Sequence, residues 1–122
     1  DVTGFSLLGH AWEMAKASGV TIRIRASAVP VLAGALELAV AGLLTSADKT
    51  NREYVGEDLE IDPSVSKEMV HLLFDPQTAG GMLISSSPLS ADELLARLRE
   101  HYPQAAIIGK VIEVVERSIV VR

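Results

Sequence analysis

The chain has 122 residues and a formal net charge of −5, and 48% of its residues are hydrophobic. This length suits one domain with a hydrophobic core, and the acidic balance argues against nucleic-acid binding. The absence of cysteine excludes disulfides, thiolate zinc sites and a thiol nucleophile within these residues. Neither a signal peptide nor an apolar run of about 18 residues is found. We therefore expect a cytoplasmic domain without membrane contact.

The first ten residues place a carboxylate, Asp1, and a turn at Gly4 directly before an amphipathic helix. A helix N-terminus exposes unpaired N–H groups and the positive end of the helix dipole, so it can receive a phosphate. Asp1 could hold a divalent cation against such a phosphate. His10 either reaches the phosphate or is a partly buried, hydrogen-bonded side chain. The alternative for the whole segment is an ordinary helix capped by Thr3 or Ser6.

The spacing of apolar residues predicts this helix over 6–18, with Gly19 as its C-terminal glycine. The alternation of apolar and polar residues over 20–25 predicts a strand. Its outward face carries Arg23 and Arg25, which either steer an anionic substrate or are simply solvated.

The apolar run 31–41 predicts a largely buried helix. Residues 43–62 lose this periodicity and are predicted to be the longest irregular stretch, which is either a functional loop or a surface excursion. Asp62 and Pro63 then predict the start of the next helix, as its N-cap and its first helical residue.

Pro76 ends that helix and pushes Asp75 out of the helical region, which frees its carboxylate to face a partner. Residues 77–81 predict a tight turn that leads into a strand over 82–85. The two glycines of this turn permit conformations or close approaches that a Cβ would block. The turn either lies against the first motif and shapes a site there, or needs its glycines for backbone geometry alone.

Ser90 and Glu93 form the pattern of a capping box, which predicts a helix with its leucines facing inward. Residues 105–115 and 118–121 predict the two strands of a C-terminal hairpin, with a bulge or close packing at Gly109. Helices and strands are interspersed along the chain. The sequence therefore predicts an α+β fold with a mixed sheet covered by helices.

Two segments resemble a known family. Residues 1–10 read DVTGFSLLGH and are similar to the signature DVTGFGLLGH of the selenophosphate synthetases (selenide, water dikinases), with Ser6 in place of glycine. Residues 72–83 read LLFDPQTAGGML and are similar to that family's LLFDPQTSGGLL, with Ala79 in place of serine and Met82 in place of leucine. The two segments come in the same order and about sixty residues apart, which is far more specific than a lone glycine motif.

This resemblance implies that residues 1–122 are a single domain, the C-terminal domain of the AIR synthase-like superfamily, and that an N-terminal ATP-binding domain lies outside the chain. The complete protein would convert selenide, ATP and water to selenophosphate, AMP and phosphate, which serves selenium metabolism and selenocysteine biosynthesis. The resemblance further implies Mg2+ as cofactor, ATP and selenide as substrates, the N-terminal domain as partner and a homodimer of the complete protein. The 122 residues alone are expected to be inactive.

The resemblance implies Asp1 as a metal ligand and assigns no catalytic residue within the chain. The other candidates belong to loops on the phosphate and substrate side of the site: Thr3, Gly4, Phe5, His10, Asn51, Asp75, Gln77, Thr78, Gly80 and Gly81. Two alternatives stay open. One is a related ATP-dependent synthetase or kinase of the same superfamily. The other is a non-catalytic interaction or regulatory domain, which the departures at Ser6 and Ala79 keep in consideration.

Overall fold

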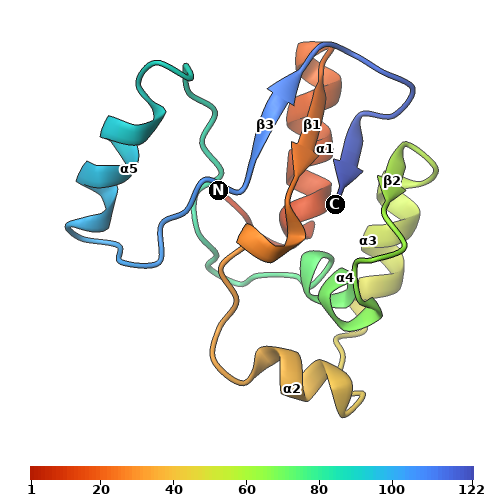
Figure 1. Ribbon diagram of the computed structural model, residues 1–122. Helices are drawn as coiled ribbons and strands as arrows, with labels where there is room; N and C mark the ends of the chain where they lie inside the picture. The colour runs from red at the N-terminus through yellow and green to blue at the C-terminus, as the bar shows by residue number, and fades with distance from the viewer.

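A computed structural model describes all residues from 1 to 122 and contains helices and strands interspersed along the chain (Figure 1). In chain order the elements are α1 (Ser6–Ser18), β1 (Thr21–Ile24), the short 3-10 helix η1 (Ala26–Ala28), α2 (Ala35–Val40), α3 (Ala47–Val55), β2 (Leu59–Ile61), α4 (Lys67–Leu73), α5 (Ala91–Arg99), β3 (Gly109–Ile112) and β4 (Ile119–Val121). None of these helices is long and apolar enough to span a bilayer.

The strands form one mixed sheet in the order β2-β4-β1-β3. β1 is antiparallel to β3 and parallel to β4, and β4 is parallel to β2. The predicted α+β fold with a mixed sheet is therefore confirmed. At Gly109 a Cβ would collide with the carbonyl oxygen of Arg23 on the neighbouring strand, so the close packing expected at this glycine is confirmed as well.

The predicted C-terminal hairpin is wrong, because β3 and β4 lie on opposite sides of β1 and do not pair with each other. The loop between them is held across the start of β1 by Thr21, a fully buried residue. The Thr21 hydroxyl donates to the Arg117 carbonyl at 2.7 Å and accepts from the Val115 N–H at 3.0 Å. Each of the two strands thus forms its hydrogen-bond ladder with β1 and not with the other.

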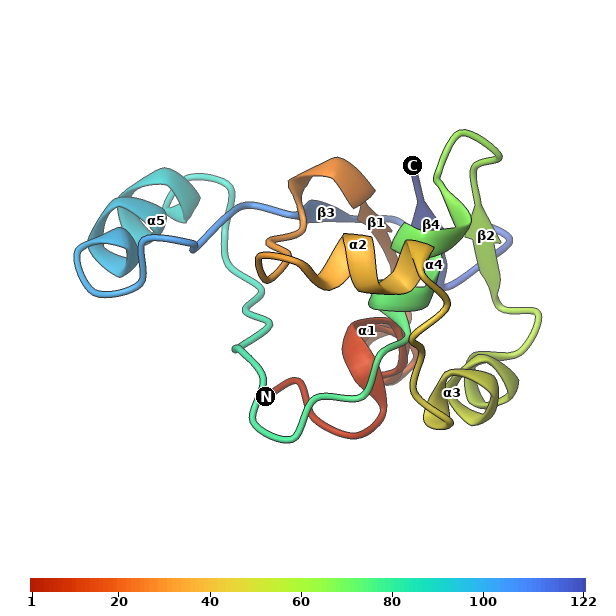
Figure 2. The same ribbon diagram turned by 90° about the horizontal axis from the view of Figure 1, so that it is seen from below.

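Helix α1 packs along one face of the sheet (Figures 1 and 2). The helix expected over 6–18 forms, and it ends at Gly19, which adopts φ +63° as a left-handed C-terminal glycine. Its buried positions meet inward residues of the central strands in one core, which includes Leu8, Ala11, Ala15, Ile24, Ile119, Val121 and Phe74. Because side chains alternate along β1, Arg23 lies on the face opposite Ile24, as predicted.

The helix predicted over 31–41 is shorter and more exposed than its composition indicates. Gly34 adopts φ +84° just before α2, so the regular helix begins only at Ala35. Of its residues only Ala39 is buried, and Leu38 and Val40 are 52% and 69% exposed. The prediction of a largely buried helix is wrong because α2 lies at the margin of the molecule, with α4 as its neighbour (Figure 1).

The segment predicted to be irregular over 43–62 contains α3 and β2. Helix α3 is mostly polar, so the spacing of its apolar residues does not indicate a helix. Two pairs at i,i+4 spacing support it, Arg52 with Asp48 and Lys49 with Glu53. Its single apolar core residue, Val55, packs against the main core.

Helix α4 begins at Lys67, four residues later than the Asp62-Pro63 pattern predicts. The carboxylate of Asp62 accepts from the N–H of Ser64 at 2.9 Å and so forms a turn before the helix. The N-cap is instead Ser66, whose hydroxyl accepts from the Met69 N–H at 3.2 Å. Pro76 does lie just beyond the end of α4, as predicted.

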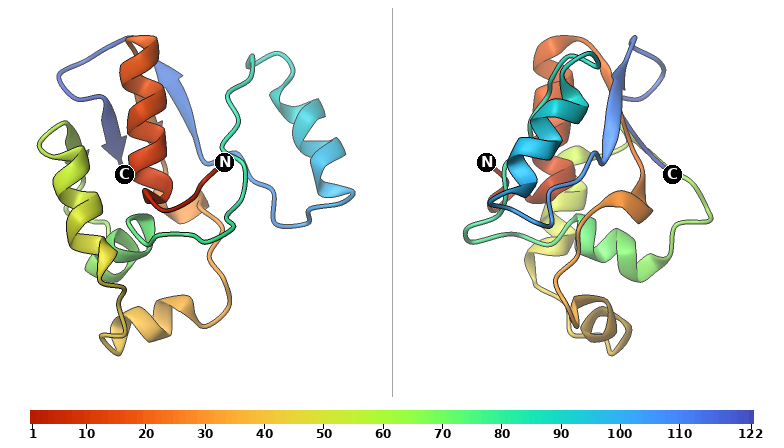
Figure 3. Two further views of the ribbon diagram at one scale, coloured as in Figure 1. Left: turned by 180° about the vertical axis from the view of Figure 1, so that it is seen from behind. Right: turned by 60° about the vertical axis from the view of Figure 1, so that its left-hand side comes forward.

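The predicted strand over 82–85 is absent, because no neighbouring strand pairs with this segment. The predicted capping box of α5 also does not form. The Ser90 hydroxyl donates to the Ser87 carbonyl and does not cap the helix. Helix α5 has no fully buried residue and stands beside the sheet and its helices (Figures 1 and 3). Its leucines are therefore only half-buried.

Candidate functional site

The two signature segments lie side by side and are joined through the backbone. The N–H of Val2 donates to the Gly81 carbonyl at 2.9 Å, and the N–H of Gly80 donates back to the Val2 carbonyl at 3.1 Å. A third bond runs from the Gln77 N–H to the Thr3 carbonyl at 3.0 Å. The turn over 77–81 thus lies against the first motif, as one of its two interpretations predicted.

Gly80 makes this close approach possible. A Cβ at this position would collide with the carbonyl oxygen of Val2, whereas a Cβ at Gly81 would meet no atom within 4 Å. Only the first glycine of the pair is therefore required by the contact between the two segments. Its neighbours in the turn, Thr78 and Ala79, are exposed.

Asn51 fastens both segments from the side of α3. Its side chain is 4% exposed and its amide nitrogen donates to the carbonyls of Gly4 at 3.1 Å and Phe74 at 3.0 Å. One carbonyl belongs to the first segment and the other to the second. Asn51 therefore holds the geometry of the loops, and its amide nitrogen is already occupied by the chain itself.

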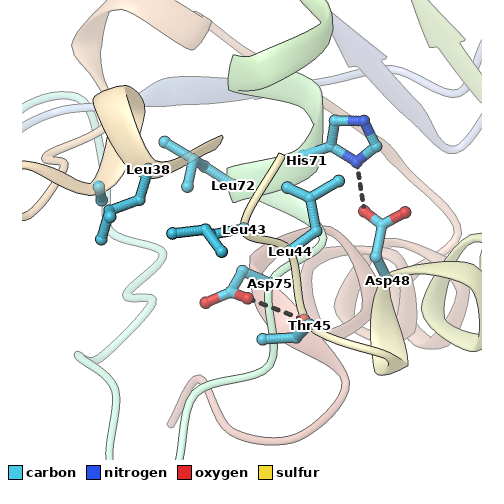
Figure 4. A pocket seen from close by; sticks show the side chains of 9 residues that line it. Leu38, Leu43, Leu44, Thr45, Asp48, His71, Leu72 and Asp75 are labelled. Atoms are coloured by element: carbon cyan, nitrogen blue, oxygen red, sulfur yellow. Dashed lines mark hydrogen bonds and ion pairs between the residues drawn. The ribbon is translucent and has the colours of Figure 1, made fainter. Parts of the chain in front are cut away.

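The carboxylate of Asp75 is hydrogen-bonded to two side chains of the chain itself. One of its carboxylate oxygens accepts from the Thr45 hydroxyl at 2.9 Å and the other from the Gln77 side chain at 3.1 Å. Figure 4 shows Asp75 and Thr45 at the edge of a small cavity of about 180 Å³ between α2, α3 and α4. The carboxylate expected to face a partner is thus engaged in shaping this turn.

Asp48 and His71 line the same cavity (Figure 4), and Arg52 joins them in a cluster of polar side chains. Arg52 donates to both oxygens of Asp48, at 2.8 and 3.1 Å, and His71 Nδ1 lies 3.1 Å from the same carboxylate. Burial raises the pKa of Asp48, but the hydrogen bonds from Arg52 and His71 outweigh it, so that the pKa lies below its ordinary value. Arg52 also stacks over the Phe74 ring at 4.6 Å.

His10 is enclosed by hydrogen bonds within the chain. Its Nε2 lies 3.0 Å from the Thr3 hydroxyl and its Nδ1 lies 2.9 Å from Glu13. The other oxygen of Glu13 accepts from the Tyr54 hydroxyl at 2.9 Å. This hydrogen bond raises the pKa of Tyr54, so the phenol keeps its proton and remains the donor. Of the two interpretations of His10, the structure supports the partly buried, hydrogen-bonded side chain.

Aromatic rings surround this network. Phe5 stacks on Tyr54 with 4.7 Å between ring centroids, and Trp12 meets Tyr54 edge-on at 5.1 Å. Phe5 remains 46% exposed beside Gly4, which is also exposed. Phe5 and Trp12 thus both contact the Tyr54 ring of α3, beside the exposed loop at Gly4.

Ser6, which replaces the glycine of the signature, has an unusual backbone. It is the only non-glycine residue with a positive φ, at +70°, and its side chain is fully buried. Its hydroxyl accepts a long hydrogen bond from the Gly9 N–H at 3.4 Å. The left-handed conformation explains why glycine suits this position, and the serine adopts it at a conformational cost.

Most of the predicted candidates therefore gather where the two segments meet, with Asp1 exposed at the start of the first one. Two residues of this region were missed, Glu13 and Tyr54. Glu13 could have been found from its spacing, because residues three apart on a helix share a face with each other, as His10 and Glu13 do. Tyr54 lay in the stretch that was predicted to be irregular. The chain contains no group of three or more His, Cys, Asp or Glu side chains arranged to hold a metal ion.

These features define an α+β domain in which an N-terminal loop, a glycine turn and the start of a helix are held together beside a mixed sheet. The chain belongs to the family described as AIR synthase related protein, C-terminal domain, whose model matches residues 1–122. This match confirms the resemblance and the fold that it implied.

Relatives with curated names agree with this assignment. A protein named selenide, water dikinase from Caldanaerobacter subterraneus subsp. tengcongensis is 45% identical over 123 residues, which cover 100% of this chain and 36% of the relative. Proteins of the same name from Clostridioides difficile (strain 630) and Clostridium botulinum (strain Eklund 17B / Type B) are 41% and 38% identical, and the matches cover 99% and 100% of this chain and 35% of each relative. The chain thus spans about a third of the length of these relatives.

Proposed function

We propose that this chain is the C-terminal domain of an ATP-dependent selenide, water dikinase, and that it contributes one side of the active site. The proposal rests on one observation above all. The two segments that resemble the family's signatures are hydrogen-bonded to each other, with Asp1 exposed where they meet. The relatives' name supports the reaction, in which selenide, ATP and water give selenophosphate, AMP and phosphate.

The arrangement suits phosphoryl transfer. Such reactions ask a protein mainly to position groups and to neutralise phosphate oxygens. The loop from Thr3 to Phe5 leads directly into the N-terminus of α1, whose first N–H groups and dipole favour an anion. We assign this loop to the phosphate side of the site, with the turn that contains Gln77 and Thr78 beside it.

The residues present fit Mg2+ as a partial ligand set. Asp1 is exposed, whereas both oxygens of Asp75 already accept hydrogen bonds from Thr45 and Gln77. Asp1 would hold the ion as one carboxylate ligand, and bound Mg2+ would neutralise phosphate oxygens. The remaining protein ligands would come from outside these 122 residues.

We further propose that an N-terminal ATP-binding domain precedes this single domain in the complete protein, as the length of the relatives suggests. That domain would be its partner within the same polypeptide, and the complete protein would act as a cytoplasmic homodimer. The 122 residues alone would then be inactive, because most of the nucleotide site would be missing.

The substitution Asp1→Asn in the complete protein tests the role of Asp1. It keeps size and hydrogen-bonding shape but removes the charge, so a turn role should survive it. We expect selenide-dependent ATP consumption to fall about 100-fold or more, as when one preorganised charge-stabilising group is lost, with the melting temperature nearly unchanged. The assay follows ATP consumption across a magnesium titration.

Asp92→Asn is the matched control, because Asp92 is exposed in the first turn of α5, away from the two segments. It removes the same charge and should leave ATP consumption unchanged. Near wild-type turnover of Asp1→Asn at limiting magnesium would remove Asp1 from the site. An equal loss in both variants would show a general charge effect.

A further inference from the structure

A hydrogen-bonded network of Thr3, His10, Glu13 and Tyr54 connects the loop of the proposed site to α1 and α3. Its bonds are 3.0, 2.9 and 2.9 Å long, all within the ordinary range of hydrogen-bond distances. The His10 side chain is 18% exposed and that of Glu13 is 41% exposed. Neither the proposed reaction nor the family match assigns a role to this network.

The chemistry of the partners sets the direction of the bonds. The Tyr54 phenol donates to one oxygen of Glu13, and the other oxygen faces His10 Nδ1. An ionised carboxylate only accepts, so Nδ1 carries a proton and donates it. In the neutral imidazole Nε2 then has a free lone pair, and the Thr3 hydroxyl donates to it.

The backbone of Thr3 is fixed independently of this network. Its carbonyl accepts from the N–H groups of Ser6 and Gln77, both at 3.0 Å. The hydrogen bond to His10 therefore fixes only the direction in which the Thr3 hydroxyl proton points. With that proton turned toward His10, the lone pairs of Thr3 Oγ1 are left for other groups.

We propose that His10 and Glu13 are positioning residues that present the Thr3 hydroxyl as a hydrogen-bond acceptor to the substrate side of the loop. An acceptor suits a proton-bearing partner, which we take to be a water molecule, and disfavours a bare phosphate oxygen. His10 acts through Thr3, since both of its ring nitrogens are already engaged. This inference rests on the proposed function, because the loop has to be part of an active site.

The first test measures kcat and KM of the complete protein in a double-mutant cycle. Thr3→Val removes the hydroxyl, and His10→Leu removes both ring nitrogens. We expect each to lower kcat about 10-fold, within the range seen when a group that orients an active-site ligand is lost, with little change in KM for ATP. The double variant should lose no more than either single one, because both remove the same oriented hydroxyl.

His101→Leu is the matched control, since His101 is exposed just after α5 and lies outside the network. It should leave kcat unchanged. Losses that multiply in the double variant, or an equal loss in His101→Leu, would overturn the positioning role. A wild type without selenide-dependent ATP consumption would overturn the proposed function and this inference with it, whereas an active wild type with multiplying losses would overturn the inference alone.

Glu13→Gln gives a second test that does not depend on activity. One end of the amide can still accept from Tyr54, but its NH2 group then faces His10 Nδ1 and favours the tautomer with the proton on Nε2. Nitrogen-15 NMR of the histidine side chains should show the Nδ1–H tautomer of His10 in the wild type and the Nε2–H tautomer in the variant. A wild-type Nε2–H tautomer, or a wild-type ring with protons on both nitrogens, would contradict the proposed direction of the bonds, because Nε2 would then donate to Thr3.

Discussion

At the scale of single residues, Ser6 occupies a backbone position that favours glycine. Its φ of +70° lies in the left-handed region, where an L-residue with a Cβ is strained and glycine is not. The compensating hydrogen bond from the Gly9 N–H is long, at 3.4 Å. The serine thus adopts a turn conformation that glycine would adopt without strain.

We therefore predict that Ser6→Gly stabilises the 122-residue chain by up to about 1 kcal/mol, since relief of strain exceeds the added backbone entropy of glycine. Thermal melting should show a rise of a few degrees, on the order of 4 °C per kcal/mol for a domain of this size. Ser18→Gly is the control, because Ser18 is an exposed helical residue of the same helix and should lose stability on the same change. A lower melting temperature for Ser6→Gly would contradict the strain argument.

At the scale of elements, α3 holds the two signature segments together although its sequence is polar. Asn51 is its only buried polar side chain and donates to one carbonyl from each segment. A buried acceptor without a donor costs desolvation free energy. The side-chain amide of Asn51 therefore contributes to the stability of the folded chain.

Asn51→Ala should therefore destabilise the chain by roughly 1–3 kcal/mol, because it leaves two carbonyls without their donor. Asn51→Asp should cost more than Asn51→Ala, since a carboxylate would face two carbonyl oxygens with no proton to donate. Thr50→Ala is the control on the same helix, as Thr50 is exposed and bonds only to the Ala47 carbonyl. Urea unfolding measures the stability of all three variants. Equal stability of Asn51→Ala and Thr50→Ala would contradict the role of Asn51 in holding the two segments together.

At the scale of the whole molecule, Asp58 joins three parts of the fold just before β2. Its carboxylate accepts from Trp12 of α1 at 3.0 Å and from both the N–H and the hydroxyl of Ser118 before β4, at 2.8 and 2.7 Å. Lys16 lies 3.4 Å away. Burial raises the pKa of Asp58, but these donors outweigh it and lower the pKa from its ordinary value of 3.8 to about 2.

A lowered folded-state pKa contributes stability that is present above the unfolded-state pKa and is lost as the pH falls through the folded-state value. We predict that the melting temperature of the chain falls between pH 4 and pH 2, and that Asp58→Asn makes this fall shallower while lowering stability at pH 7. Asp92→Asn, on an exposed turn of α5, should keep the wild-type slope. An unchanged slope in Asp58→Asn would show that other carboxylates dominate acid unfolding.

The sequence by itself determined the elements that have a clear local pattern. It also determined the resemblance of the two signature segments to a known family. Helix α1 and its glycine end follow from apolar spacing and turn chemistry, and β1 follows from strict alternation. The resemblance supplied Asp1 and the loops around it as candidates, and the comparisons confirmed the family. These features depend on residues close together in the sequence, which is why a sequence can specify them.

The tertiary structure alone decided which elements meet. The parallel pairing of β4 with β1, the position of α3 and the exposure of α2 depend on contacts between distant residues, and no local period encodes them. The network from Thr3 to Tyr54 is of the same kind, since its last bond joins residues 41 positions apart. Periodicity tells which face of an element is apolar, but only folding selects the surface on which that face comes to lie.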